Sequence, residues 1–163
     1  ESIYVDVAVN NETLRIYNVH LQSISFEPED YKYIDKVKGM DVEKGSSKRI
    51  AKMLKNAFKK RSNHVDIMKT HFANCKLPFV VTGDFNDTPA SYAVTKMTES
   101  LNNAFTEKGQ GFGTTYNGKF PNFQIDYIAT TKDINVTNYH IIKAKISDHF
   151  PVRSDLSLKT VAR

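Results

Sequence analysis

The residues that could do chemistry are acids, amides and histidines in four short clusters. The clusters are Asn18 with His20, Asp84 with Asn86, Asp126, and Asp148 with His149. Carboxylates offer hard oxygen ligands that suit Mg²⁺ or Mn²⁺, and a histidine paired with an acid is oriented and made more basic. Cations and imidazoles can neutralise the charge that develops on phosphoryl oxygens. Together these groups predict hydrolysis of a phosphate ester by water.

Each cluster alone is also compatible with a purely structural role. Gly, Asp and Asn form ordinary turns, which would account for Asp84 and Asn86. A lone histidine such as His20 is more often a hydrogen-bonded structural residue than a catalyst. The functional interpretation therefore depends on whether the fold brings the four clusters together.

A short apolar strand leads directly into the second cluster. Residues 77–81 carry no polar side chain, which predicts a strand buried on both faces. Gly83 lets the backbone leave the sheet, and Asp84 and Asn86, two positions apart, project to the same side of an extended path. A carboxylate and a carboxamide then lie side by side at a strand end, where sheet enzymes commonly hold their catalytic groups.

The first residues predict an antiparallel hairpin. Apolar side chains recur at every second position over residues 3–9, and a second alternating run covers residues 14–21, the period of half-buried strands. The break at residues 10–12 supplies asparagines that tolerate the backbone of a tight turn. In the second strand, Asn18 and His20 fall on one face, opposite Val19 and Leu21.

Residues 46–74 predict a long amphipathic helix, with apolar side chains at spacings of three, four and seven. Ser46 or Ser47 is the expected cap, and Ser62-Asn63 is a weak point. Most of the intervening basic residues, a set that includes Arg61, are expected on the solvated face, because no aromatic residues interleave with them as stacking platforms would. The alternative is a nucleic-acid-binding helix, which predicts binding that weakens steeply with salt and no hydrolysis.

The remaining chain alternates between loops, helices and strands. Pro28 opens a short helix within a charged surface segment, residues 27–45, and Ser91 is the expected cap of another helix. The glycine-rich residues 109–118 form either a loop that contacts substrate or a plain connector. Further strands are expected at residues 123–130, 134–142 and 152–158.

Asp126 falls inside the first of these later strands, between apolar neighbours. A carboxylate there is costly unless it is paired or lies at an opening. We therefore expect Asp126 to have a partner or to face a site.

Length and composition limit the class of protein. With 163 residues, 40% hydrophobic and 25% charged, the chain resembles one ordinary globular domain with its own core. No run of about 18 apolar residues is present to span a membrane, and residues 1–5 lack the features of a signal peptide. The single cysteine, Cys75, cannot form an internal disulfide. The net charge of +5 is compatible with a phosphate-bearing partner.

In order and type, the clusters resemble the motifs of the endonuclease/exonuclease/phosphatase superfamily, the group of deoxyribonuclease I. The matching stretches are Asn18-Val19-His20-Leu21, Gly83-Asp84-Phe85-Asn86, Ile125-Asp126-Tyr127-Ile128 and Ser147-Asp148-His149-Phe150-Pro151-Val152. They cover nearly the whole chain. The resemblance implies an α/β (α+β) fold, a four-layer α/β sandwich in which two packed mixed β-sheets are flanked by helices.

The resemblance implies catalytic roles for four residues. Asp84 resembles the aspartate that orients or deprotonates the attacking water, and Asn86 resembles its partner that positions the phosphate. His149 resembles the histidine described as general base or as transition-state stabiliser, and Asp126 the acid that holds it.

Three further residues take implied roles around the phosphate. His20 resembles the histidine that contacts phosphate and protonates the leaving oxygen. Asp148 resembles a ligand of the metal site, which implies Mg²⁺ or Mn²⁺ as cofactor. Asn18 is a weaker candidate for substrate binding and could simply order its loop.

One departure from the family pattern concerns the principal metal ligand. Family members carry a strand with an asparagine and then a strand ending in a glutamate, both before the Asn-x-His-Leu motif. Seventeen residues precede Asn18, and neither Glu1 nor Glu12 is a convincing substitute for that glutamate. Residues 1–163 are therefore expected to form a single, N-terminally incomplete domain, with an unpaired sheet edge and an exposed apolar face.

The leading hypothesis is a divalent-metal-dependent phosphoesterase of the nuclease, phosphodiesterase or phosphatase type. The positive charge slightly favours nucleic acid as the substrate, while phosphoinositide, sphingomyelin and nucleotide substrates are served by the same motifs. The alternative is a catalytically inactive interaction module of the same fold. The intact clusters argue against that module, and the missing glutamate argues for it.

Overall fold

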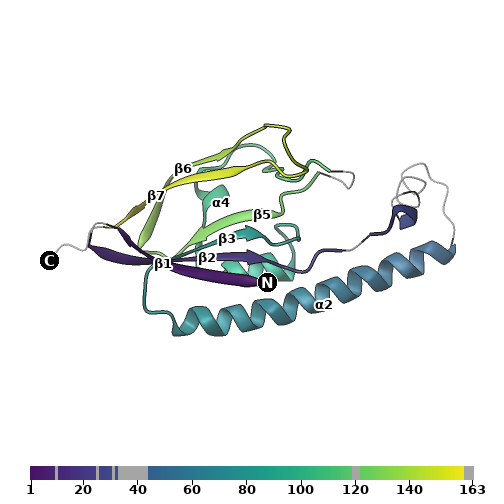
Figure 1. Cartoon of the computed structure of the whole chain (residues 1–163), viewed down its shortest axis with the longest axis horizontal. Helices are drawn as coiled ribbons and strands as arrows, with labels where there is room; N and C mark the ends of the chain where they lie inside the picture. Colours follow the sequence, from purple (N-terminus) through teal and green to yellow (C-terminus); the bar gives the residue numbers. More distant parts are fainter. Residues whose placement is uncertain (10, 25, 31, 33–43, 119–121, 160–163) are drawn as a thin grey trace.

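Helices and strands are mixed along the chain, as expected for an α/β protein (Figure 1). The computed structural model describes residues 1–9, 11–24, 26–30, 32, 44–118 and 122–159. The elements are β1 (Ser2–Val9), β2 (Glu12–His20), α2 (Lys44–Asn74), β3 (Phe79–Asp84), α3 (Tyr92–Thr98), β4 (Asn102–Asn103), α4 (Ala104–Lys108), β5 (Asp126–Thr130), β6 (Ile134–Ile141) and β7 (Val152–Leu158).

The predicted N-terminal hairpin is confirmed. Strands β1 and β2 pair antiparallel, and the turn between them places Asn11 at a φ of 68°, a left-handed conformation that asparagine tolerates. Val19 is fully buried, whereas Asn18 and His20 are exposed on the opposite face. The alternation in the sequence therefore gave the correct faces of β2.

Strand β3 lies at the centre of a five-stranded mixed sheet with the order β1-β2-β3-β5-β4. It pairs in parallel with β2 and antiparallel with β5. Val80 and Val81 are both buried, which confirms the prediction of a strand covered on both faces. A parallel pair needs a crossover connection, and the chain between β2 and β3 includes α2 for that purpose.

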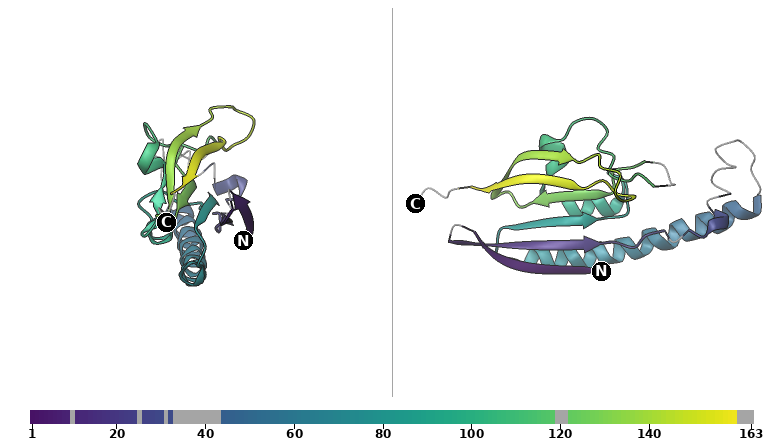
Figure 2. Two further views of the ribbon diagram at one scale, coloured as in Figure 1. Left: turned by 90° about the vertical axis from the view of Figure 1, so that its left-hand side faces the viewer. Right: turned by 45° about the horizontal axis from the view of Figure 1, so that its top comes forward.

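Helix α2 lies along one face of this sheet, and part of it extends past the sheet (Figures 1 and 2). Val65, Met68 and Phe72 belong to one buried cluster with Tyr17 and Val81 of the sheet. The predicted apolar face of the helix is thus confirmed. Helix α3 joins the same cluster, and the hydroxyl of its predicted cap, Ser91, accepts a hydrogen bond from the Val94 amide.

The predicted cap of α2 is wrong. The helix begins at Lys44, so Ser46 and Ser47 lie inside it and neither can be its cap. The helix continues through Ser62, whose hydroxyl donates to the Phe58 carbonyl one turn earlier, so the weak point expected there does not interrupt it. Arg61 is buried rather than solvated, with 1% of its surface exposed.

Strands β6 and β7 form a second sheet, which lies on the face of the five-stranded sheet opposite to α2 (Figure 1). Tyr127 and Ala129 of β5 belong to the cluster shared with α2, whereas Ile128 packs against the second cluster, with Val136 and Tyr139 of β6. Alternate residues of β5 thus contact different layers, as the pleat of a strand requires. The second sheet is antiparallel rather than mixed, because its two described strands follow one another along the chain.

The short helix predicted after Pro28 falls mostly outside the described residues. Among the helices that the structure does describe, none is long and apolar enough to cross a membrane.

Candidate active site

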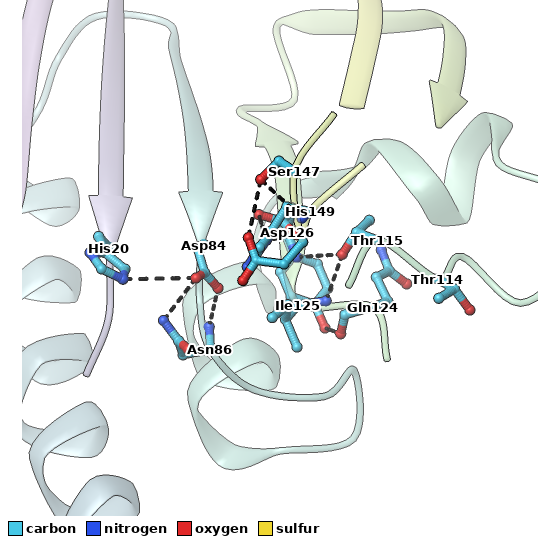
Figure 3. Close-up of polar contacts among 12 residues, drawn as sticks. His20, Asp84, Asn86, Thr114, Thr115, Gln124, Ile125, Asp126, Ser147 and His149 are labelled. Atoms are coloured by element: carbon cyan, nitrogen blue, oxygen red, sulfur yellow. Dashed lines mark hydrogen bonds and ion pairs between the residues drawn. The ribbon is translucent and has the colours of Figure 1, made fainter. Parts of the chain in front are cut away.

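Strand register places three of the predicted residues in one row. In the parallel pairing His20 lies opposite Asp84, and in the antiparallel pairing Asp84 lies opposite Asp126. Figure 3 shows the three side chains at neighbouring strand ends. Only glycine fits at position 83 in this arrangement. Its φ of 134° is a backbone conformation that other residues rarely adopt, and a Cβ atom there would clash with the Val19 backbone.

Asn86 fixes the carboxylate of Asp84 in place. Its backbone N–H donates to Asp84 Oδ1 at 2.7 Å and its side-chain Nδ2 donates to Oδ2 at 2.9 Å. Nδ2 also donates to the Leu21 carbonyl at 3.1 Å, which connects the loop after β3 to the end of β2. Asn86 has a φ of 51°, one of the left-handed conformations in which asparagine is enriched.

Burial raises the pKa of Asp84 above its usual value. The hydrogen bond from the Asn86 amide opposes this shift, and the negative charge of Asp126 adds to it. Asp84 is therefore a stronger base than an exposed aspartate.

Asp126 and His149 form a close pair. Nδ1 of His149 lies 2.9 Å from Oδ2 of Asp126 and 3.2 Å from Oδ1 (Figure 3). An ionised carboxylate only accepts hydrogen bonds, so Nδ1 carries the proton of this contact. Nε2 is then the ring nitrogen that can interact with a ligand. The expectation that Asp126 needs a partner is thus confirmed.

The pKa of His149 lies above its usual value. Burial lowers the pKa of the imidazole, but the hydrogen bond to Asp126 and the charges of Asp126, Asp84 and Asp148 outweigh that effect. The positive form of His149 is therefore favoured beside this group of acids.

The glycine-rich loop supports this pair, a role that the sequence did not indicate. Thr115 Oγ1 accepts hydrogen bonds from the Ile125 and Asp126 amides, and the Thr115 carbonyl accepts one from the Phe150 amide. The Tyr116 ring meets the His149 ring edge-on, with centroids 5.3 Å apart. Because these contacts join segments far apart along the chain, neither alternation nor spacing could have found them.

Asp84, Asp126 and His149 could together hold a metal ion. Each offers one ligand atom, and these atoms all lie within 4.8 Å of one another. The two carboxylates suit Mg²⁺ or Mn²⁺, whereas His149 could ligate only through Nε2 and only in its neutral form, because its Nδ1–H is held by Asp126. The negative charges of Asp84 and Asp126 repel each other in this partly buried place, which a cation would relieve.

Asp148, the predicted metal ligand, is not in that group of three. Its carboxylate accepts a hydrogen bond from the Ser147 hydroxyl at 3.1 Å, and its backbone carbonyl accepts one from the Asn117 amide. It is exposed, and it lines the same cavity as His149. A ligand role for Asp148 therefore stays a prediction.

A cavity of about 480 Å³ brings most of the predicted residues together. Its lining includes the predicted residues His20, Asp84, Asn86, Asp148 and His149. Asp126 lies behind His149, in contact with it. His20 is exposed, with Nε2 3.8 Å from Asp84 Oδ2, and Asn18 lies on β2, outside the residues that line the cavity.

Arg61 is a supporting residue that the sequence analysis misplaced. Its Nε donates to Asp87 Oδ2 at 2.8 Å, and its Nη1 donates to the Gln22 carbonyl at 2.8 Å. It thereby joins α2 to the segment after β2 and to the loop after β3. Its spacing of four from Ala57 and from Val65, both buried, indicates the apolar face and was the available clue.

Residues 70–149 match the profile of a family described as Endonuclease/Exonuclease/phosphatase family. A search of curated proteins found no match. Solved structures with the same fold include an endonuclease/exonuclease/phosphatase family protein from Bacteroides thetaiotaomicron, 17% identical, with a TM-score of 0.64 over 93% of this chain and 52% of that one.

Two other structures are similar over comparable spans. The human Nocturnin catalytic domain with bound sulfate anion is 17% identical, with a TM-score of 0.60 over 97% of this chain and 52% of that one. A mannosyl-6-phosphatase from Bacteroides thetaiotaomicron is 18% identical, with a TM-score of 0.59 over 91% of this chain and 53% of that one. The chain thus spans about half the length of the structures that it matches.

Proposed function

We propose that this chain, whose residues 70–149 match the profile of the endonuclease/exonuclease/phosphatase family, acts in the divalent-metal-dependent hydrolysis of phosphate esters. Water attacks phosphorus with the assistance of Asp84 and His149. The observation that carries the proposal is the cluster of Asp84, Asp126 and His149, whose candidate ligand atoms lie within 4.8 Å of one another and of which Asp84 and His149 line the cavity.

Asp84 is the group that orients or deprotonates the attacking water. Its two hydrogen bonds from Asn86 hold the carboxylate in one orientation, and its raised pKa makes it a better proton acceptor. The carboxamide of Asn86, held in turn by the Leu21 carbonyl, positions the phosphate.

His149 stabilises the charge that develops on the phosphoryl oxygens. Its Nδ1–H is held by Asp126, so Nε2 is the atom that meets the substrate. The raised pKa favours the imidazolium, which donates a charged hydrogen bond to an anionic oxygen. In its neutral form the same nitrogen can accept a proton.

The other predicted residues complete the proposal. His20, exposed at the cavity wall, contacts the phosphate and protonates the leaving oxygen. Asn18 is a weaker substrate-binding candidate. Mg²⁺ or Mn²⁺ would be held by the carboxylates of Asp84 and Asp126, with Asp148 as a further candidate ligand, and would supply Lewis-acid stabilisation of phosphoryl charge when bound.

The test is hydrolysis by the full 163-residue chain, with Mg²⁺ and with EDTA. The substrates are bis-p-nitrophenyl phosphate, plasmid DNA and inositol phosphates. We expect turnover that EDTA abolishes and that His149→Ala lowers by roughly 10²- to 10⁴-fold. His140→Ala is the matched control, because His140 is exposed on β6 and does not line this cavity.

One outcome would contradict this proposal, and another would decide whether the family's glutamate is needed. Silence of the chain, and of any longer protein that contains it, on every substrate would reject hydrolysis and favour the catalytically inactive interaction module. Metal-dependent turnover by this chain alone would show instead that the glutamate absent from the sequence pattern is not required.

A further inference from the structure

The candidate cavity extends well beyond the phosphate-binding end. At about 480 Å³ it is in the range of pockets that hold drug-sized organic molecules, so a single phosphate leaves most of it empty. Its lining also includes apolar side chains from the segment after β2, from α2 and from the segment before β5. These residues are Ile24, Phe26, Leu54, Phe58, Phe123 and Ile125.

The charges of the lining argue against a substrate with several phosphates. Arg61 is the one lysine or arginine among the described residues that line the cavity. It is buried, and its guanidinium already binds the Asp87 carboxylate and the Gln22 carbonyl. Apart from the histidines, the described lining therefore offers a second phosphate no unpaired cationic side chain.

Aromatic rings in the wall indicate the kind of group that fits. Phe58 is 46% exposed and Phe123 is 40% exposed, so both offer apolar surface that a ligand could remove from water. The guanidinium of Arg61 lies 4.8 Å from the centroid of the Phe58 ring, which restrains that ring as part of a rigid wall. Flat aromatic groups stack on such rings with favourable free energy.

Resting on the function proposed above, we infer that the substrate is a phosphate ester that carries one phosphate and one flat aromatic group. The phosphate binds beside Asp84 and His149, and the aromatic group, a nucleobase or an aryl ring, stacks against Phe58 and Phe123 of the same cavity lining.

Calorimetric titration of the full chain in the presence of Mg²⁺ tests this inference. The ligands are inorganic phosphate, phenyl phosphate, adenosine 5′-monophosphate, hexyl phosphate and inositol 1,4,5-trisphosphate. We expect phenyl phosphate and adenosine monophosphate to bind about tenfold more tightly than inorganic phosphate. Stronger binding of the nucleotide identifies a nucleobase site, and equal binding identifies a general aryl site.

Phe58→Ala should weaken the binding of the two aromatic ligands about tenfold and leave the binding of inorganic phosphate unchanged. Phe112→Ala is the matched control, because Phe112 is exposed and lines a different cavity. The inference is overturned if hexyl phosphate binds as tightly as phenyl phosphate, if inositol trisphosphate binds most tightly, or if no ligand binds.

The binding and hydrolysis results separate the two proposals. An aromatic preference without turnover of any substrate would reject the proposed hydrolysis and support the aromatic site. Turnover that His149→Ala abolishes, without any aromatic preference, would support the hydrolysis and reject the aromatic site.

Discussion

The contact between Asp126 and His149 controls the charge at the centre of the candidate site. The two side chains are partly buried, and the imidazole is surrounded by acids. The hydrogen bond at 2.9 Å therefore favours the imidazolium over the neutral ring. The hydrogen bond to Asp126 thus both favours the positive charge of His149 and fixes the orientation of its ring.

Asp126→Asn should lower the pKa of His149 in the metal-free protein, because the amide cannot match the charged hydrogen bond of the carboxylate. NMR titration of the His149 ring protons measures this pKa. The matched control is Asp155→Asn, which changes an exposed aspartate paired with Arg153 on β7. An unchanged pKa in Asp126→Asn would show that Asp126 does not hold the imidazolium.

The same contact makes stability depend on pH. Since the folded-state pKa of His149 is raised, its contribution to stability is complete below the ordinary histidine pKa of about 6.5. It is lost as the pH rises from there through the raised folded-state value. Asp126→Asn should reduce this part of the pH dependence of the free energy of unfolding.

Gly83 is required by the backbone geometry that aligns the strand ends. Gly83→Ala should cost about 3 kcal/mol or more in the free energy of unfolding, because a Cβ would meet the Val19 backbone at a φ of 134°. Gly111→Ala is the control, since it has a positive φ but open space around it, and about 1 kcal/mol is expected. Urea unfolding measures both, and equal costs would show that the close approach to Val19 is unimportant.

At the scale of single residues, the sequence predicted the residues that gather at the cavity better than the residues that support them. His20, Asp84, Asn86, Asp148 and His149 were chosen by type and spacing, and all five line one cavity. Thr115 and Tyr116 were noticed only as part of a glycine-rich loop. Their contacts with Asp126 and His149 depend on tertiary structure, which a local pattern does not contain.

At the scale of elements, α2 connects the core to the site. Its apolar face packs on the sheet, and Arg61 reaches from that face to the loops after β2 and β3. The period of the helix was predictable from the sequence. Burial of Arg61 was missed because its lysine and arginine neighbours are solvated, and because a buried guanidinium is stable only with partners that come from other elements.

Arg61→Met should destabilise the protein by about 3–5 kcal/mol, since it leaves the buried Asp87 carboxylate without its cation. The double variant Arg61→Met/Asp87→Asn should be more stable than Arg61→Met alone. It removes the unpaired charge and retains an oxygen acceptor for the Thr88 amide.

Chemical unfolding of the single and double variants measures this coupling. Lys60→Met, at an exposed position of the same helix, controls for the introduced side chain and should change stability little. If the double variant is less stable than Arg61→Met, the unpaired Asp87 carboxylate is not the cause of the destabilisation.

At the scale of the molecule, the second sheet covers only part of the first. Strands β6 and β7 lie over β5, whereas β1 pairs only with β2 among the described strands (Figures 1 and 2). Ile3 is 71% exposed and Val5 is 54% exposed on β1. The apolar face and unpaired edge expected from the sequence are therefore present. A four-layer sandwich and a single domain over residues 1–163 stay predictions.

Ile3→Lys combined with Val5→Lys should reduce self-association of this chain. The exposed apolar face and free edge of β1 favour contacts between copies, and lysines on an edge strand oppose them. Light scattering across a range of protein concentrations measures the effect. The control variant places lysines at the exposed positions Glu12 and Thr13 of β2. Equal self-association of both double variants would show that copies of the chain do not associate through β1.

The row formed by His20, Asp84 and Asp126 links ligand binding to folding. Each residue comes from a different strand, so the binding geometry exists only after the parallel and antiparallel pairings have both closed. Pairings between distant segments form slowly, because a long loop must be ordered first. A ligand that bridges the three strand ends binds only the fully paired sheet and therefore stabilises all three strands together by mass action. Partial opening of any of these three strands would release the ligand, so ligand affinity reports the integrity of β2, β3 and β5 together.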